Sequence, residues 1–360
     1  MDEEGWGLSE SHKPPRPQLS AACIPGLEPL VAGELQRRLP GASVLATAFG
    51  YVRFTYPGPP ADSLTLRTTE DVFTHIACLV DVPADASGLG VIEAALAACD
   101  LSPALKVLGA MRELPASPRF RVTATREGAH EFRSPQVAAR AGSGIIAQTG
   151  WGVDLTAPDV DIWVQVRDDR ATAGLRLSDE SMSRRSRVMH GPASLRPTVA
   201  HAMCLLAEAQ PGEVLLDPMC GTGTILLEAT PLALTLVGSD TYVPSLAAAA
   251  ANFSAVGLPG LLIQADAREL PLRDASVDRI VCNLPWGIRV GSHRYNRQLY
   301  PAFLAEAHRL LRPGRRMVLL SQEKRLLEGA LARWPDFGVR QTFTVHLGGL
   351  APSIYVVERT

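Results

Sequence analysis

The second half of the chain alternates short apolar runs with longer segments of mixed polarity. Five runs have the length of strands, and a helical pattern, LRPTVAHAMCLLAEA, precedes the first of them. Apolar runs with little alternation are typical of strands buried on both faces, as in a parallel sheet covered by helices. The pattern therefore predicts an α/β domain over residues 192–360. The five predicted strands are EVLLD, TLVGSD, LLIQAD, DRIVCN and RRMVLLSQ.

The last two apolar runs of the chain differ from these five. QTFTVHL and PSIYVVERT predict two strands that follow each other directly, because only the short segment GGLA joins them. Two such strands with a glycine-containing connection predict a hairpin at the sheet edge.

The first half of the chain predicts smaller α+β units. Over residues 20–110, LSAACIPG and GYVRFTY have the pattern of strands, and LEPLVAGELQRRL has apolar residues on one helical face. After the breaker cluster PADASGLG, the segment VIEAALAACDLSPALKVLGAM predicts one helix. Residues 64–80 mix polar and apolar positions and predict no single element.

A second unit is expected over residues 111–180. PRFRVTATREG predicts a strand, and SPQVAARAGSGIIAQTG predicts a helix with Ser134 as N-cap and Pro135 at its first position. DVDIWVQVRDD and ATAGLRLS predict two strands that pair as a hairpin. Residues 181–191 have no apolar periodicity and predict a basic linker to the C-terminal domain.

Composition agrees with a globular chain of two or three domains. The 360 residues are 46% hydrophobic and 20% charged, and the formal net charge is −2. Residues 1–19 are polar and contain prolines without an apolar core, so we expect a disordered tail and not a signal peptide. No stretch approaches the roughly 20 apolar residues of a membrane span, so no membrane partner is expected.

The six cysteines are scattered and form no CxxC pair. Free thiols fit a reducing compartment, so the sequence predicts a cytoplasmic protein without disulfides. The same spacing argues against a zinc site, and no metal is expected.

The segment VLLDPMCGTGTI, residues 214–225, has the form of a strand, an acidic residue and a glycine-rich turn that leads into a helix. Asp217 is expected to end the strand, and Gly221 and Gly223 allow a ligand to approach the backbone closely. The glycines alone would also suit a nicotinamide-dependent enzyme or a simple tight turn. The full GxGxxG spacing of dinucleotide-binding proteins is absent.

Two further acids follow in order along the predicted sheet. Asp240 is expected to end the second strand, where a carboxylate accepts hydrogen bonds from ribose hydroxyls. Asp266 is expected to end the third strand, where it would accept from an adenine amino group. Because the carboxyl ends of parallel strands meet at one edge, the three acids indicate a site for a nucleoside-type cofactor.

The segment IVCNLPWG, residues 280–287, ends the fourth strand and indicates amine chemistry. The exocyclic amine of a base is a poor nucleophile because its lone pair is delocalised into the ring. Acceptors such as the side-chain oxygen of Asn283 and the backbone carbonyl of Leu284 would localise that lone pair on nitrogen. Pro285 stiffens the turn, and Trp286 offers a face on which a base can stack.

Together these motifs resemble the class I S-adenosylmethionine-dependent methyltransferases that modify amines, whose signature is of the NPPY type. Here leucine replaces the first proline and tryptophan replaces the usual tyrosine or phenylalanine. The resemblance implies a Rossmann-like domain, S-adenosyl-L-methionine as cofactor, and catalytic roles for Asn283, Leu284, Pro285 and Trp286. It implies that the cofactor contacts Thr198, Asp217, Pro218, Cys220, Gly221, Thr222, Gly223, Thr224, Asp240, Asp266, Ala267 and Asn283.

The first half of the chain resembles RNA-binding modules. FRVTATREGAHEFRSPQVAARAGSGI, with the strands that follow it, resembles the THUMP domain, and PGLEPLVAGELQRRL resembles its ferredoxin-like companion. The likeness continues through SRRSRVMHGPASLRPTVAHAM and covers about residues 20–360. The whole resembles the tRNA guanosine-N2 methyltransferase group, in which the THUMP unit grips the acceptor-stem end. It implies N2 methylation of a guanosine in structured RNA, tRNA being the expected substrate.

Arginines in the RNA-facing half support that expectation, since the planar guanidinium binds phosphate bidentately. Isolated arginines are also common as solvated surface charges, but a cluster lies in the linker, together with His190. The predicted RNA-binding residues are Arg119, Arg121, Arg126, Arg133, Arg140, Arg184, Arg185, Arg187, Arg289 and Arg294.

Two alternatives stay open at this point. The NPPY-like motif also serves amino methyltransferases that act on adenine or on protein glutamine. A non-catalytic RNA-binding protein that retains the fold is the second alternative. The sequence does not define whether a small activating partner protein is needed.

Overall fold

The computed structural model describes residues 17–185, 189, 191, 194–232, 234–288 and 291–360. These residues form two compact units. The first comprises the chain up to Cys23 together with Val31–Met182, and the second comprises Ile24–Leu30 together with Ser183–Thr360.

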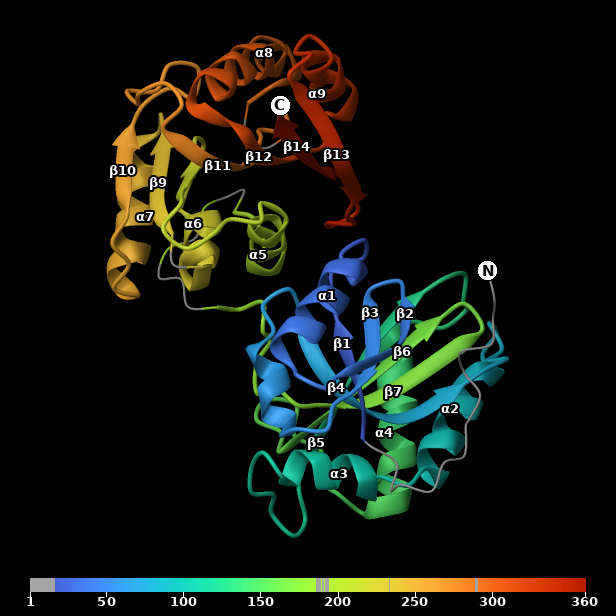
Figure 1. The fold of residues 1–360 in the computed structure, drawn as a ribbon. Coiled ribbons are helices and arrows are strands. Elements are labelled where there is room, and N and C mark those ends of the chain that lie inside the picture. The colour runs from blue at the N-terminus through green and yellow to red at the C-terminus, as the bar shows by residue number, and fades with distance from the viewer. Residues whose placement is uncertain (1–16, 186–188, 190, 192–193, 233, 289–290) are drawn as a thin grey trace. The chain divides into compact units, whose positions relative to one another are not determined.

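The first unit contains one sheet of seven strands in the order β2-β3-β1-β4-β7-β6-β5 (Figure 1). Antiparallel pairing of β4 with β7 joins the strands of the first 110 residues to those that follow. β5 and β6 are parallel, and the other pairs are antiparallel. The strands are β1 (Gln18–Ala22), β2 (Ser43–Ala48), β3 (Tyr51–Thr55), β4 (Asp71–Leu79), β5 (Phe120–Glu127), β6 (Val160–Arg167) and β7 (Arg170–Arg176).

Apolar residues at alternate strand positions form the core of this unit. Val52 and Phe54 of β3, and Ile162 and Val164 of β6, are at most 1% exposed. Because side chains alternate between the two faces of a strand, the intervening residues lie on the other face of the sheet. The helices of this unit are α1 (Glu28–Arg38), α2 (Ser87–Ala98), α3 (Ser102–Gly109) and α4 (Ser134–Thr149), together with the 3-10 turn Pro60–Thr65.

Four expectations for the first unit need correction. The single helix expected over residues 91–111 is two helices, because Pro103 suits only a first turn and Asp100 accepts a hydrogen bond from the Ser102 amide at 2.9 Å. Residues 64–80, left without an element, contain the central strand β4. Arg133, and not Ser134, occupies the N-cap position of α4. The expected tail 1–19 overlaps β1, which begins at Gln18, and residues 1–16 lie outside the described part.

The second unit contains a sheet in the order β10-β9-β8-β11-β12-β14-β13 (Figure 1). The first five strands in that order are parallel, and β14 pairs antiparallel with β12 and β13. The predicted hairpin at the sheet edge is confirmed. The strands are β8 (Val214–Asp217), β9 (Thr235–Asp240), β10 (Leu261–Gln264), β11 (Val277–Asn283), β12 (Leu311–Ser321), β13 (Phe337–Thr344) and β14 (Ser353–Arg359).

Helices pack on both faces of this sheet and enclose two apolar clusters. One cluster includes Val199 and Leu226, which lie on α5 and α6, and the other includes Tyr300 and Leu327, which lie on α8 and α9. Ile24 and Leu27 belong to the first of these clusters, although they come from the N-terminal part of the chain. The helices are α5 (Pro197–Leu206), α6 (Thr224–Ala229), α7 (Val243–Ala255), α8 (His293–Leu310) and α9 (Lys324–Leu331), with the 3-10 turn Thr230–Leu232.

This strand order places β8 between β9 and β11, so the direction of winding changes beside β8. In open α/β sheets, ligands bind outside the carboxyl ends of the strands at such a switch point. The strands β8, β9 and β11 end at Asp217, Asp240 and Asn283, as the sequence predicts. The third strand ends at Gln264, so Asp266 lies two residues beyond it and not at its end. None of the described helices is long and apolar enough to span a membrane.

Candidate active site

The glycine-rich turn after β8 is tied to the end of β9. Asp240 accepts hydrogen bonds from the backbone N–H groups of Gly221 at 2.9 Å and Tyr242 at 2.8 Å. The turn is also fixed by the Cys220 amide, which donates to the Ser239 carbonyl at 2.9 Å. Asp240 is therefore built into the turn and still has carboxylate lone pairs to offer a ligand, since a carboxylate has about four acceptor sites.

Both glycines of this turn have positive φ, 53° at Gly221 and 82° at Gly223. A Cβ on Gly221 would meet no described atom within 4 Å, so space lies open above the turn. A Cβ on Gly223 would lie 2.8 Å from Cε1 of Phe253, a buried ring that also packs against Gly260. Gly221 thus leaves room for a ligand, whereas Gly223 is required for packing.

Asp217 lies at the carboxyl end of β8 and is 1% exposed. Burial raises the pKa of its carboxyl group to about 8, and the neighbouring charge of Asp240 adds to that rise. The hydrogen bond that it accepts from the Met219 amide, at 3.3 Å, acts in the opposite direction. A buried acid of this kind is stabilised when a positively charged ligand comes close to it.

Asp266 forms a bidentate ion pair with Arg268. The Arg268 guanidinium donates from Nε to one carboxylate oxygen at 2.9 Å and from a terminal nitrogen to the other at 2.6 Å. These hydrogen bonds hold the pKa of Asp266 below its usual value. Arg268 also lies 6.0 Å from the ring centroid of Tyr295. The sequence reasoning missed this pair, although a spacing of two residues was a signal for it.

The other predicted cofactor residues are buried in the second unit. Thr222 is buried, its hydroxyl lies 3.2 Å from that of Ser194, and its carbonyl accepts from Asn252 at 3.0 Å. Thr198 on α5 and Thr224 on α6 are also buried. Pro218 accepts a hydrogen bond from the Ser239 hydroxyl at 2.9 Å, and Ala267 is buried beside Asp266.

The cysteines bordering the site are packing residues. All six cysteines are free, and Cys220 and Cys282 are buried. Burial raises the pKa of both thiols well above the usual value, so neither is a reactive thiolate. Within the described residues, no group of three or more His, Cys, Asp or Glu side chains could hold a metal ion.

The motif after β11 contains two buried polar atoms without partners. The side-chain oxygen of Asn283 and the indole nitrogen of Trp286 are inaccessible, and neither has a hydrogen-bond partner in the described part of the chain. Such atoms are rare in folded proteins, because leaving a buried polar group unpaired costs roughly 1–3 kcal/mol. The acceptor predicted for the amine is therefore present and free of any described donor.

Helix α8 holds the turn of this motif in place. The carbonyl oxygen of Pro285 accepts two hydrogen bonds at 2.7 Å, one from the side-chain amide of Asn296 and one from the hydroxyl of Tyr300. Both donors are fully buried. Tyr300 also lies 2.9 Å from the Ser321 hydroxyl at the end of β12, so the hydrogen bonds connect β11, α8 and β12. We call Asn296 and Tyr300 the α8 clamp.

Glu323 completes the support of the turn. It accepts a hydrogen bond from Asn296 at 2.7 Å and pairs with the imidazole of His293. Gly287, with φ of 71°, brings the chain close to this group, because a Cβ there would lie 2.8 Å from the His293 amide nitrogen. The sequence contained no signal for these hydrogen bonds, which join residues 11 to 30 positions apart.

Of the arginines predicted to bind RNA in the first unit, some form ion pairs with acidic residues and others do not. Several are paired with acids: Arg119 with Asp154 at 3.5 Å, Arg121 with Asp161 at 2.5 Å and Arg140 with Glu93 at 2.9 Å. Arg126 donates to the Gly128 carbonyl, and Arg133 is exposed at the start of α4. In the second unit Arg185 pairs with Glu228 and Arg294 is exposed on α8. Arg184 is exposed, whereas Arg187, His190 and Arg289 lie outside the described residues.

Comparison with known proteins agrees with this architecture. Residues 105–176 match the THUMP domain, and residues 184–353 match the RMKL-like methyltransferase domain. The tRNA (guanine(6)-N2)-methyltransferase of Thermus thermophilus is 36% identical over 347 residues, which are 95% of this chain and 99% of that protein. The chain belongs to the THUMP-containing guanine-N2-methyltransferase family.

A solved structure of this methyltransferase family has the same fold. The crystal structure of TrmN from Thermus thermophilus matches with a TM-score of 0.78 at 35% identity, covering 96% of this chain and all of that one. The tRNA (guanine(6)-N(2))-methyltransferase THUMP3 of Bos taurus is 37% identical over 67% of this chain, which spans about half of that longer protein. The Rossmann-like fold and the THUMP domain predicted for this methyltransferase are confirmed.

Proposed function

We propose that this enzyme transfers a methyl group from S-adenosylmethionine to the exocyclic N2 amine of a guanosine in tRNA. The observation that carries the proposal is the unpartnered, buried oxygen of Asn283 at the carboxyl end of β11, beside the switch point of the sheet. Two relatives named for guanine 6 of tRNA, from Thermus thermophilus and Bos taurus, support guanine 6 as the modified position.

The residues around the β8 turn fit the cofactor. The open space above Gly221 admits a ligand against the backbone, and Asp240 holds its carboxylate at that turn. S-adenosylmethionine, when bound, supplies a methyl group activated by a positively charged sulfur. In this proposal Asp240 accepts hydrogen bonds from the ribose hydroxyls of the cofactor, and Asp266 accepts one from its adenine amine. The Gly221 turn contacts the rest of the cofactor. Arg268 shares the Asp266 carboxylate with that amine.

The chain's own residues act on the guanine. Asn283 accepts a hydrogen bond from the N2 amine, and the carbonyl of Leu284 accepts a second, which directs the nitrogen lone pair at the methyl group. As positive charge develops on nitrogen, both acceptor dipoles stabilise it without rearranging. Trp286 stacks the base, and the α8 clamp fixes the turn that presents it. The new nitrogen–carbon bond would form as the methyl–sulfur bond of the bound cofactor breaks, and the positively charged nitrogen would then release one proton to solvent. Because that nitrogen is strongly acidic, no titrating side chain is needed for this step.

The RNA-facing assignments are part of the same proposal. We retain a ferredoxin-like domain over 20–110, a THUMP domain over 111–180, a linker over 181–191 and a methyltransferase domain over 192–360. Because Arg119, Arg121 and Arg140 are paired with acids, the exposed Arg133, Arg184 and Arg294 are the stronger candidates for phosphate contacts. A cytosolic location stays a prediction.

The test is transfer from labelled S-adenosylmethionine to unmodified tRNA, followed by digestion and mass spectrometry of the nucleosides. We expect N2-methylguanosine from the unaltered enzyme, lost when guanine 6 of the tRNA is replaced by adenine. Asn283→Ala should lower kcat by about 100-fold or more, while the Kd for tRNA stays within twofold.

Three results would contradict the proposal. Methyladenosine as product would be consistent with amine methylation but would contradict guanine as the methylated base. Full activity of Asn283→Ala would remove the assigned acceptor. Binding of tRNA without cofactor binding would indicate a non-catalytic RNA-binding protein.

A further inference from the structure

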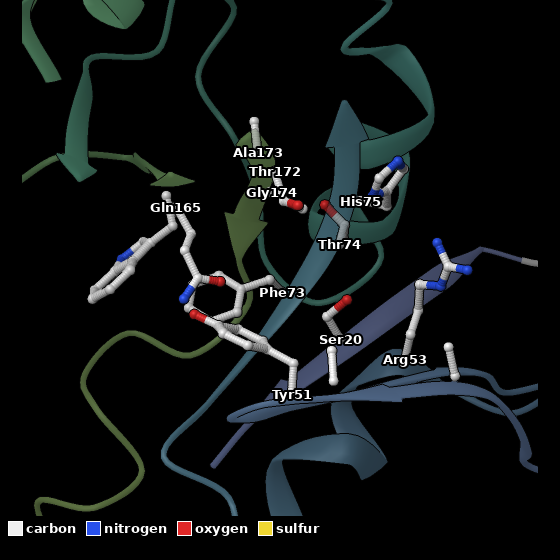
Figure 2. A pocket seen from close by; sticks show the side chains of 13 residues that line it. Ser20, Tyr51, Arg53, Phe73, Thr74, His75, Gln165, Thr172, Ala173 and Gly174 are labelled. Atoms are coloured by element: carbon white, nitrogen blue, oxygen red, sulfur yellow. The ribbon is translucent and has the colours of Figure 1, made fainter. Parts of the chain in front are cut away.

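The sheet of the first unit contains a pocket on the face opposite its apolar core. Core residues such as Val52 and Val164 occupy one set of alternating positions, and the pocket is lined by the other set. Figure 2 shows these side chains rising from several strands, with Tyr51, Phe73 and Gln165 close together. We call this the sheet-face pocket.

The pocket has aromatic walls. Tyr51, Phe73 and Trp163 line it, and the rings of Phe73 and Trp163 lie 5.4 Å apart at an angle of 51°. Phe73 is 5% exposed, so it forms a floor, while Tyr51 and Trp163 are half-buried. Phe73 and Trp163 pack against each other, so the half-buried rings of Tyr51 and Trp163 are the ones on which a flat, unsaturated ring can stack.

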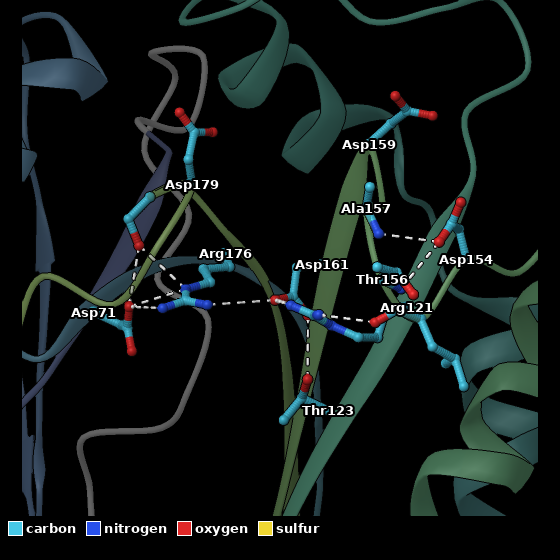
Figure 3. A network of polar contacts seen from close by, with 12 residues as sticks. Asp71, Arg121, Thr123, Asp154, Thr156, Ala157, Asp159, Asp161, Arg176 and Asp179 are labelled. Carbon is cyan, nitrogen blue, oxygen red and sulfur yellow. Dashed lines mark hydrogen bonds and ion pairs between the residues drawn. The ribbon is translucent and has the colours of Figure 1, made fainter. Parts of the chain in front are cut away.

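A buried ion network lies beside one of these walls. The Arg176 guanidinium lies 6.0 Å from the Trp163 ring centroid and pairs with Asp71 at 2.5 Å and with Asp161 at 3.5 Å (Figure 3). Asp161 is held in turn by Arg121 at 2.5 Å. Arg176, Asp71 and Asp161 are all buried. The indole thus lies beside charged groups that are already paired with one another.

Three polar side chains at the pocket have no hydrogen-bond partner within the described chain. The indole nitrogen of Trp163 is buried and has no acceptor there. The side chains of His75 and Gln165 also line the pocket, and no hydrogen bond joins them to another described residue. Burial, aided by nearby Arg53, lowers the pKa of His75, so its neutral ring offers one donor and one acceptor. Gln165 likewise offers both.

The size of the pocket limits what it can hold. Its volume is about 100 Å³, and one water needs roughly 10–15 Å³ of such space. There is room for one ring system but not for a length of folded chain. A flat ring with donors and acceptors along its edge matches both the aromatic walls and the unpaired amide and imidazole. Nucleobases have this chemistry, and a base is free to enter only where it is unpaired.

We propose that the sheet-face pocket binds one unpaired base of the RNA substrate. The base stacks against Trp163 and Tyr51, and its edge is read by Gln165 and His75. Arg53, which also lines the pocket, faces the phosphate of the same nucleotide. The proposal rests on the proposed function only in taking RNA as the substrate.

The test uses the full-length enzyme with Gln165→Ala and Trp163→Leu. Gln165→Ala removes the edge contact, and Trp163→Leu keeps an apolar wall while removing the aromatic face on which the base stacks. Thr125→Ala is the control, because Thr125 is an exposed residue on the same sheet face, outside the pocket. Thermal unfolding establishes that each variant is folded.

We expect both pocket variants to raise the Kd and the KM for tRNA by about 5- to 100-fold, the range for losing a base contact. The kcat at saturating tRNA and the Kd for S-adenosylmethionine should stay unchanged, and Thr125→Ala should match the unaltered enzyme. With tRNA carrying a photoreactive base at an unpaired position, a crosslink is expected in the peptide that contains Trp163.

Each other outcome overturns the pocket assignment. If the unaltered enzyme methylates tRNA and both variants bind it equally well, the pocket does not hold RNA and the proposed function stands. If the variants lose kcat without a change in tRNA affinity, the pocket acts on folding or catalysis instead. If the unaltered enzyme binds no RNA but binds S-adenosylmethionine, both the RNA substrate and the pocket assignment fail.

Discussion

The side-chain amide of Asn296 donates to the carbonyl oxygen of Pro285 at 2.7 Å, across 11 residues of sequence. The amine-methyltransferase signature has two prolines in this turn, and this chain has Leu284 in place of the first. A proline restricts the backbone covalently, whereas here the α8 clamp restricts it through two buried hydrogen bonds. The α8 clamp therefore restricts this turn where the chain lacks one of the two prolines.

Breaking the clamp should slow catalysis without weakening cofactor binding. Asn296→Ala removes one hydrogen bond to Pro285 and is expected to lower kcat by about 10- to 100-fold, because small displacements of reacting groups are costly. Tyr300→Phe should have a smaller effect in the same direction. Steady-state kinetics and calorimetric titration of S-adenosylmethionine distinguish the two effects. The control is Gln298→Ala, an exposed residue on the same helix, and equal kcat in all three variants would refute the role of the clamp.

Asp240 should control affinity for the cofactor. Asp240→Ala removes the acceptor of the Gly221 and Tyr242 amides and the carboxylate proposed to hold ribose. We expect the Kd for S-adenosylmethionine to rise about 10-fold or more, since hydrogen bonds to a charged group contribute roughly 1.5–3 kcal/mol. Calorimetry measures it, with Asp336→Asn as the control at an exposed acid paired with His308. An unchanged Kd would contradict the ribose assignment.

Asp217 should make the stability of the cofactor-free enzyme depend on pH. Its pKa is raised to about 8 in the folded state, against about 4 for an unfolded aspartate. Because the folded state binds this proton more tightly, Asp217 contributes its full stabilisation to the free energy of unfolding below about pH 4. That contribution is lost as pH rises towards 8. Asp217→Asn cannot ionise, so the difference in free energy of unfolding between the two proteins, measured in urea, should be constant below about pH 4.

At higher pH the two proteins should diverge. The stability of Asp217→Asn relative to the unaltered enzyme should increase by on the order of 1 kcal/mol per pH unit up to about pH 8 and then level off. A difference that is independent of pH would show that Asp217 does not titrate in this range.

Gly223 should be required for packing and not merely for its backbone angle. Gly223→Ala introduces a Cβ 2.8 Å from Phe253 at a φ of 82°, whereas Gly212→Ala has a φ of 86° and meets no described atom within 4 Å. Left-handed strain alone costs about 1–2 kcal/mol, so both variants lose that amount. Gly223→Ala should lose at least about 1 kcal/mol more by urea unfolding. Equal losses of unfolding free energy in the two variants would mean that the Phe253 ring moves aside at no cost.

The strand ends and the catalytic motif followed from local pattern. An apolar run followed by Asp or Asn marks where a buried strand ends, and the structure ends β8, β9 and β11 at those residues. The split between α2 and α3 was missed although Pro103 was visible, because helical periodicity on both sides hid the break. β4 was missed because its pattern mixes both faces of a central strand.

The sequence by itself determined the fold class, the positions of most strands along the chain and the chemical types at the site, since these depend on periodicity and on neighbours along the chain. It did not determine which charged side chains are already paired with another residue of the protein. Arg121 is paired with Asp161, and Arg176 with Asp71, over 40 and 105 residues. The α8 clamp and the sheet-face pocket arise in the same way, because strands and helices distant in sequence bring these side chains together. Only the tertiary structure decides such contacts, since burial and hydrogen bonding depend on neighbours in space.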